Sequence, residues 1–99
     1  MKVMVLIEAP VKPEDVSNMK SYLAELLPET QAYDGCQGID VYFNTSDVGN
    51  MVLVEHWDSR AHHKKYVAWR TETGVMDKLG AMFAGPPSIR YFKRTDPLR

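Results

Sequence analysis

The sequence has little of what disulfide-rich, zinc-binding and membrane proteins need. It contains one cysteine, Cys36, which excludes an intrachain disulfide and a cysteine-based zinc site. No apolar run approaches the ~20 residues of a membrane-spanning helix. The apolar start at residues 3–7 is interrupted by Glu8 and has no signal-peptide cleavage site. A small domain without disulfides fits a reducing compartment, so we expect a cytoplasmic protein with no membrane partner.

Charge of one sign is also scarce. Lys and Arg number 12 against 13 Asp and Glu, which gives a formal net charge of −1. Because this balance provides no uniform positive field for phosphate backbones, we expect no nucleic-acid partner. The composition, 44% hydrophobic and 25% charged over 99 residues, is instead typical of a single globular domain.

Apolar runs bounded by proline and glycine predict four strands and two helices. The expected strands are 2–9, 38–45, 51–57 and 88–93. The first helix should begin at Pro13 and end before Gly35, and Pro28 should bend or divide it because proline has no amide hydrogen to donate. The second helix should cover 61–72, and helical spacing resumes at 75–83 after an interruption at Gly74.

The element order β-α-β-β-α-β predicts an α+β fold of the ferredoxin-like kind, with a four-stranded antiparallel sheet and two helices on one face. We expect one domain over 1–94 and a loose tail over 95–99. The first and third strands are apolar on both faces, so the uncovered sheet face needs an apolar partner. A second copy of the chain is the simplest candidate, and a homodimer through the sheet faces is therefore predicted.

Three short stretches support a family resemblance over most of the chain. The sequence resembles the antibiotic biosynthesis monooxygenase domain, in which a third strand ending Glu-x-Trp passes through Asp/Glu-Ser into a helix. The matching stretches are Gly35-Cys36-Gln37-Gly38-Ile39, Glu55-x-Trp57-Asp58-Ser59 and Tyr66-Val67-Ala68-Trp69-Arg70.

The resemblance implies a dimeric α+β barrel that oxidises quinol- or anthrone-like aromatic compounds with O2 and uses no metal, flavin or haem. Tyr66 stands where the family often has histidine, and a phenol is a poor base at neutral pH, so a hydrogen-bond donor is expected there. The haem-degrading branch is disfavoured, since Met76 replaces its histidine and residues 2–9 contain no asparagine.

The expected catalytic residues lie on the second helix. Spacings of three and four place His62, Tyr66 and Trp69 on one side, with His63 and Arg70 beside them. The proton acceptor would be His62 or His63, the donors Tyr66 and Trp69, and the fixed positive charge Arg70. In the alternative interpretation these rings only pack and the histidines face solvent. The spacing does not decide which histidine points inward.

The expected substrate-binding residues are Trp57, Glu55 and Met76. Trp57 and Glu55 share one face of the third strand because strand side chains alternate. Burial would raise the pKa of Glu55 unless an arginine pairs with it, and a structural ion pair is the favoured interpretation. The arginines considered are Arg60, Arg70 and Arg90.

A metal centre is disfavoured, because adjacent histidines such as His62 and His63 point about 100° apart on a helix. Cys36 has no basic neighbour in the sequence that would activate it, so an inert thiol is expected. The sequence thus favours a cofactor-independent monooxygenase acting on a small aromatic substrate and O2. The alternative is a non-catalytic dimeric barrel that binds a small hydrophobic ligand.

Overall fold

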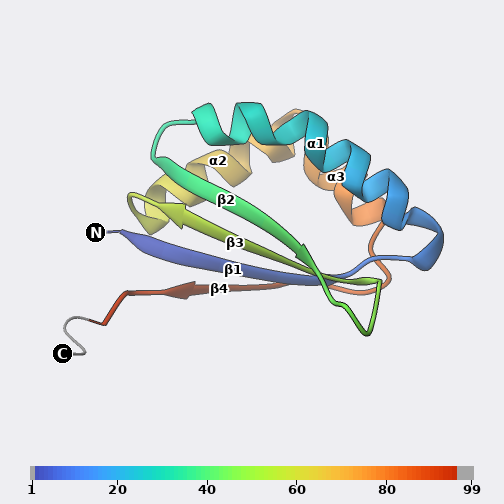
Figure 1. The fold of residues 1–99 in the computed structure, drawn as a ribbon. Helices are drawn as coiled ribbons and strands as arrows, with labels where there is room; N and C mark the ends of the chain where they lie inside the picture. The colour runs from blue at the N-terminus through green and yellow to red at the C-terminus, as the bar shows by residue number, and fades with distance from the viewer. Residues whose placement is uncertain (1, 96–99) are drawn as a thin grey trace.

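The computed structural model describes residues 2–95 and contains one four-stranded antiparallel sheet with its helices on one face (Figure 1). The sheet order is β2-β3-β1-β4. The elements are β1 (Val3–Pro10), η1 (Pro13–Asp15), α1 (Val16–Ala32), β2 (Cys36–Phe43), β3 (Asn50–Trp57), α2 (Arg60–Glu72), α3 (Val75–Ala81) and β4 (Ser88–Phe92). This confirms the ferredoxin-like β-α-β-β-α-β order. Residues 96–99 of the predicted tail lie outside the described part of the chain.

The helix boundaries follow local sequence signals with one exception. Ser59 caps α2, since its hydroxyl accepts a hydrogen bond from the backbone N–H of His62. Gly74 adopts a left-handed conformation with φ of 83° and separates α2 from α3, as predicted. Of the two outcomes expected at Pro28, a bend or a division, the division is wrong, because α1 continues to Ala32. Pro28 and the carbonyl-bearing Ala24 are both exposed, so water can solvate the unpaired carbonyl. No helix among residues 2–95 is long and apolar enough to span a bilayer.

The core consists of two clusters on the helix-facing side of the sheet. One lies towards Met51 on β3 and includes Met19 and Leu23 of α1. The other lies towards Trp57 at the opposite end of β3 and includes Val5 and Tyr66, with further aromatic rings around them. Alternation along β3 explains this placement, since Met51, Leu53, Glu55 and Trp57 are all buried.

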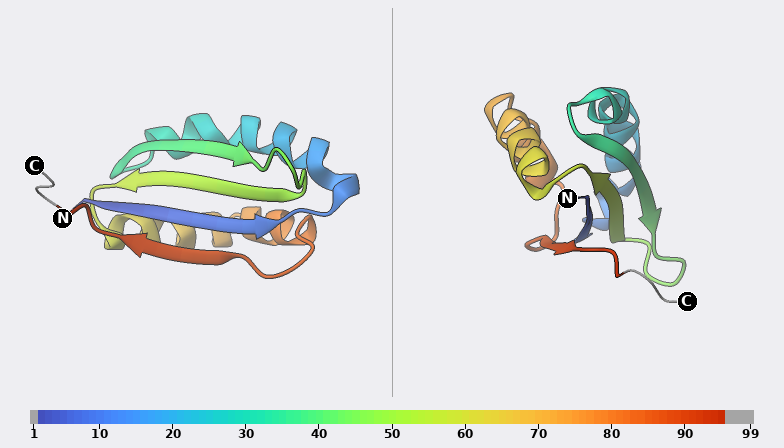
Figure 2. Two further views of the ribbon diagram at one scale, coloured as in Figure 1. Left: turned by 60° about the horizontal axis from the view of Figure 1, so that its bottom comes forward. Right: turned by 90° about the vertical axis from the view of Figure 1, so that its left-hand side faces the viewer.

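The helices lie on one side of the sheet, and no described helix or strand covers the other side (Figure 2). Leu6 lies opposite Val54 in the β1–β3 pairing, and both are only half-buried. Tyr42 on β2 and Phe92 on β4 are 55% and 39% exposed. The same face also carries the charged pair of Glu8 and Arg90, so its apolar side chains lie beside polar ones.

Candidate functional site

A cavity of about 330 Å³ lies between the sheet and the helices. Its wall is built by α1, the inner face of the sheet, α2 and α3, and it is apolar except at four side chains. Those four are Thr30, Glu55, His63 and Tyr66. Apolar walls with a few convergent polar groups are typical of small-molecule sites.

Glu55 is the buried acid of this cavity. Its side chain points from β3 towards the helices and the residue is 2% exposed. Trp57 Nε1 donates a 2.9 Å hydrogen bond to Glu55 Oε1, and this bond favours the carboxylate. Burial acts in the other direction and prevails, raising the pKa of Glu55 to about 7.

Among the described residues, none of the three arginines considered forms the predicted ion pair with Glu55. Arg60 lies over the ring of Tyr91, and Arg90 faces Glu8 on the opposite side of the sheet. Arg70 is committed to α1, as described below. The expected structural ion pair is therefore wrong, whereas the expected effect of burial on the pKa of Glu55 is observed.

His63 is the histidine that points inward. It is 1% exposed, and its Nε2 lies 3.6 Å from Glu55 Oε1. Its Nδ1 lies 2.7 Å from the hydroxyl of Tyr91 on β4. Burial lowers the pKa of His63 to about 4, so the ring is neutral at pH 7. With Tyr91 donating to Nδ1, the remaining ring N–H sits on Nε2 and faces Glu55.

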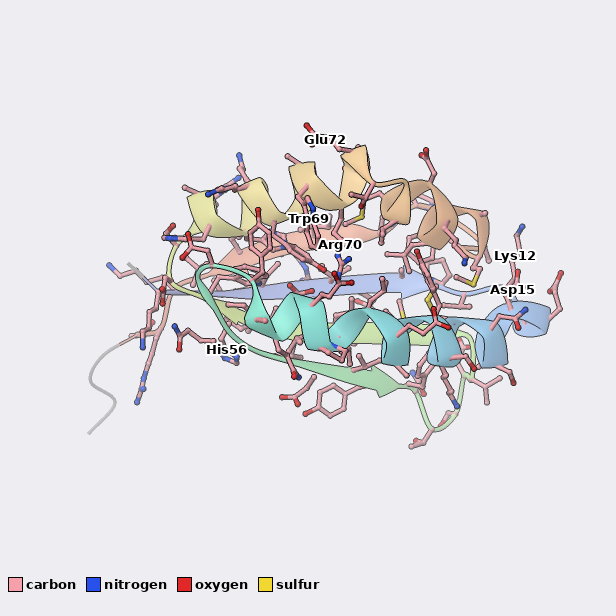
Figure 3. The ribbon with its side chains drawn as sticks, turned by 90° about the horizontal axis from the view of Figure 1, so that it is seen from above. Lys12, Asp15, His56, Trp69, Arg70 and Glu72 are labelled. Carbon is pink, nitrogen blue, oxygen red and sulfur yellow. The ribbon has the colours of Figure 1, made fainter. Side chains whose placement is uncertain are left out.

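The Tyr66 hydroxyl belongs to a buried network that joins α2 to α1. It lies 2.6 Å from Thr30 Oγ1, and Arg70 Nε donates to it over 3.0 Å. The same guanidinium donates to the carbonyl of Leu26 and to Thr30 Oγ1. Figure 3 shows Arg70 reaching from α2 towards α1. Thr30 can donate its hydroxyl hydrogen either to the Leu26 carbonyl or to the Tyr66 oxygen. In the second case the Tyr66 hydroxyl hydrogen is not used in the bond to Thr30 and is available to another acceptor.

Of the other expected site residues, one lines the cavity and three do not. Met76 is a lining residue, whereas Trp57 is not and instead donates its ring N–H to Glu55. His62 sits at the start of α2, with Nδ1 2.6 Å from the Ser59 hydroxyl. Trp69 is not among the cavity-lining residues, because its ring lies between Tyr33 and the Arg70 guanidinium.

Gly35 lies directly against the ring of His62, outside the cavity. This glycine has a φ of 89°, and a side chain there would collide with the His62 ring. Only glycine combines that backbone conformation with such close approach. The Gly-Cys-x-Gly stretch therefore positions the end of α1 against the start of α2.

Sequence reasoning missed Thr30 and Tyr91 as site residues. Thr30 continues the α1 stripe of Leu23 and Leu26 at helical spacing, so a longer stripe would have included it. Tyr91 follows Ile89 by two residues on β4 and therefore shares its inward face.

The described residues offer no alternative chemistry from metal or thiol. No group of three or more histidine, cysteine, aspartate or glutamate side chains in residues 2–95 could hold a metal ion. Cys36 is half-buried, and burial raises the pKa of its thiol, which favours the unreactive protonated form.

Comparisons with known proteins agree with this architecture. A family model described as antibiotic biosynthesis monooxygenase matches residues 2–71. The Rv0793 structure from Mycobacterium tuberculosis is 21% identical with a TM-score of 0.84, and 100% of each chain is covered. A conserved protein from Methanosarcina mazei Go1 is 18% identical with a TM-score of 0.86, covering 96% of this chain and 94% of that one. A structure described as an antibiotic biosynthesis monooxygenase is 20% identical with a TM-score of 0.84, covering 94% of this chain and 98% of that one. No protein of curated function matches the sequence.

Proposed function

Because this chain belongs to the antibiotic biosynthesis monooxygenase family, we propose that it is a cofactor-independent monooxygenase that oxidises a quinol- or anthrone-like aromatic molecule with O2. The observation that carries the proposal is a buried carboxyl group, Glu55, at the polar end of an apolar cavity. Its pKa of about 7 makes it half ionised near neutral pH. A general base is most effective when its pKa lies near the working pH.

Glu55 is the proton acceptor in this mechanism. Its carboxylate takes a proton from the substrate hydroxyl or from an activated C–H group, and the resulting anion is electron-rich enough to reduce O2. His63, with its pKa of about 4, is a weak base at neutral pH and instead presents Nε2–H beside the carboxylate. The apolar wall lowers the local dielectric, which strengthens the interaction of the Glu55 carboxylate with the substrate proton and with His63 Nε2–H.

Oxygen transfer then needs only O2 and the proton that Glu55 holds. The substrate anion gives one electron to O2, and the two radicals combine into a carbon-bound peroxide. Glu55 returns its proton to the peroxide, and loss of water converts the C–H carbon into a carbonyl. One oxygen atom enters the product and the other leaves as water, so the reaction balances without an added reductant.

Tyr66 is proposed to stabilise the substrate oxyanion. Arg70 and Thr30 can both donate to the Tyr66 oxygen, which polarises the O–H bond and directs its proton into the cavity. Donors fixed in advance at a developing charge are worth about 10²-fold or more in rate. Arg70 acts through Tyr66 and does not line the cavity itself.

The test is oxygen consumption by chelator-treated protein with a panel of hydroquinones and anthrones, corrected for their spontaneous autoxidation. We expect a catalysed rate that survives metal removal and falls about 10²-fold or more in Glu55→Gln. The matched control is Glu72→Gln on the exposed side of α2, which should keep the full rate. A Glu55→Gln protein as active as the wild type would overturn the assignment of the base.

The apolar cavity also supports the second candidate, a barrel that binds a small hydrophobic ligand without turnover. The two are separated by measuring binding and oxygen consumption on the same compounds. Saturable binding without any catalysed rate across the panel would favour the binding protein.

The uncovered sheet face supports a homodimer in either case. We propose that the face containing Leu6, Val54 and Tyr42 packs on the same face of a second copy. The lone cysteine with its unreactive thiol supports a cytoplasmic location, which we also propose.

A further inference from the structure

The polar groups of the cavity are gathered at one end. Along β3 the wall passes from Glu55 through Leu53 to Met51, and along α1 it passes from Thr30 to Leu23. Because β3 and β1 carry their helix-facing residues in matched rows, Glu55 lies level with Val5, whereas Met51 lies level with Ala9. The Glu55 end holds all four polar side chains, and the Met51 end holds none.

The length of the cavity follows from the spacing of its lining residues. Met51 and Glu55 are four positions apart on the strand, a rise of about 13 Å. Leu23 and Thr30 are seven positions apart on the helix, a rise of about 10 Å. The volume of about 330 Å³ is at the small end of the range for ligand sites. The space is therefore long and narrow, and it suits one ring with a slender extension.

The exposed part of the wall is also without charge. Three exposed residues line the cavity here: Gly80 of α3, Pro87 just before β4, and Ile89 of β4, which is 47% exposed. A hydrocarbon group can pass this edge without losing hydrogen bonds, whereas an ionised group would find no partner there.

We propose that the substrate is a single-ring phenol whose oxygen atoms lie at one end and whose opposite end carries an alkyl chain of about five carbons, as the cavity length allows. The phenol hydroxyl contacts Glu55, His63 and Tyr66, and the alkyl chain of the substrate lies between Leu23 and Met51. The oxidation of this phenol rests on the proposed function, but its binding does not.

Two other shapes fit less well. A compound that spans the whole cavity and has a hydroxyl group at each end would bury one of them against Leu23 and Met51, where no polar side chain can pair with it. A four-ring aromatic with oxygen substituents along its length would likewise place some of them against the apolar wall. One-ended polarity is therefore the property that selects the ligand.

The test is binding of 4-alkylphenols, from phenol to 4-octylphenol, measured anaerobically by calorimetry on the full chain so that turnover cannot interfere. We expect Kd to fall about threefold to fourfold with each added methylene up to about five carbons, and then to stop falling. The methyl ether 4-pentylanisole should bind at least about tenfold more weakly than 4-pentylphenol, because the buried polar groups lose their partner. A Kd that does not depend on chain length, or equal binding of 4-hydroxybenzyl alcohol and 4-pentylphenol, would overturn the inference.

Two variants locate the ends of the bound molecule. Leu23→Phe should move the optimum to a shorter chain while the preference for phenol over anisole persists. Glu55→Gln should reduce that preference while the optimal chain length stays the same. If the series behaves as expected but no phenol is oxidised, the ligand class stands and the proposed monooxygenase fails. If phenols without an alkyl chain are oxidised and the Kd of the 4-alkylphenols does not change with chain length, the proposed monooxygenase stands and the ligand class fails.

Discussion

At the scale of single residues, Glu55 is the side chain whose burial is energetically unfavourable when it is ionised. A carboxyl group with one hydrogen-bond donor and 2% exposure is held in its protonated form more strongly than in water. The ordinary pKa of 4.5 therefore rises to about 7 in the folded protein. Functional sites commonly concentrate such unfavourable groups, and removing them can stabilise the fold.

This pKa shift predicts how stability depends on pH. The folded state holds the Glu55 proton more tightly than the unfolded state, so stability is fully present below pH 4.5 and is lost as pH rises through about 7. Glu55→Gln should match the wild type at pH 4.5 and exceed its free energy of unfolding by about 3 kcal/mol at pH 8. Urea unfolding at both pH values measures the difference.

His63 provides an internal check on this experiment. Its pKa is lowered from 6.5 to about 4, so its contribution is present above pH 6.5 and is lost as pH falls through about 4. Both proteins contain His63, so the difference between their unfolding curves reports Glu55 together with its contact with His63. A difference that does not change between pH 4.5 and 8 would contradict the raised pKa of Glu55.

At the scale of elements, the Arg70 side chain of α2 joins this helix to α1 through hydrogen bonds. Its guanidinium is buried and donates to Leu26, Thr30 and Tyr66. Arg70→Met removes these three bonds and leaves the buried Tyr66 and Thr30 oxygens with one donor fewer each, so we expect a loss of about 2–4 kcal/mol in the free energy of unfolding. Thermal and urea unfolding measure this loss.

Two comparisons make the Arg70 prediction specific. Arg70→Lys keeps the charge but not the forked geometry, so it should recover less than half of the loss. Lys64→Met changes an exposed cation on the same helix and should alter stability by no more than about 0.5 kcal/mol. An Arg70→Met protein as stable as Lys64→Met would show that the network does not hold the helices together.

The elements themselves were largely predictable, because the information is local. The apolar run around Leu53 and the break at Gly74 specify their structure through neighbouring residues alone. Which histidine points inward was not predictable, because His62 and His63 lie on the same turn and differ in their contacts with distant segments. His62 contacts Gly35, whereas His63 contacts Tyr91 and Glu55. The missing arginine partner of Glu55 depends on packing between distant segments, which periodicity does not encode.

At the scale of the whole molecule, the two faces of the sheet differ in what covers them. The inner face supplies the cavity, and the outer face leaves Leu6 and Val54 without cover among the described elements. A chain of 99 residues gains substantially from a second layer on such a face. The assembly and the site can therefore be tested separately.

Light scattering at micromolar concentration should give the mass of a dimer. Val54→Asp places a charge in the centre of the outer face and should yield monomers, because burying an unpaired carboxylate between two sheets is costly. Val48→Asp is the matched control, since Val48 is 66% exposed in the β2–β3 connection and should leave the dimer intact. A wild-type protein with the mass of a monomer would contradict the homodimer.

The central claim is that Glu55 removes the substrate proton, and the pH dependence of catalysed oxygen consumption tests it most directly. After subtraction of autoxidation, kcat/KM should rise about tenfold per pH unit below pH 7 and level off above it, as Glu55 ionises. Glu55→Gln should lose this limb together with the rate, and Glu72→Gln should keep both. A wild-type profile that is flat between pH 5 and 8, or a limb that survives in Glu55→Gln, would contradict the account.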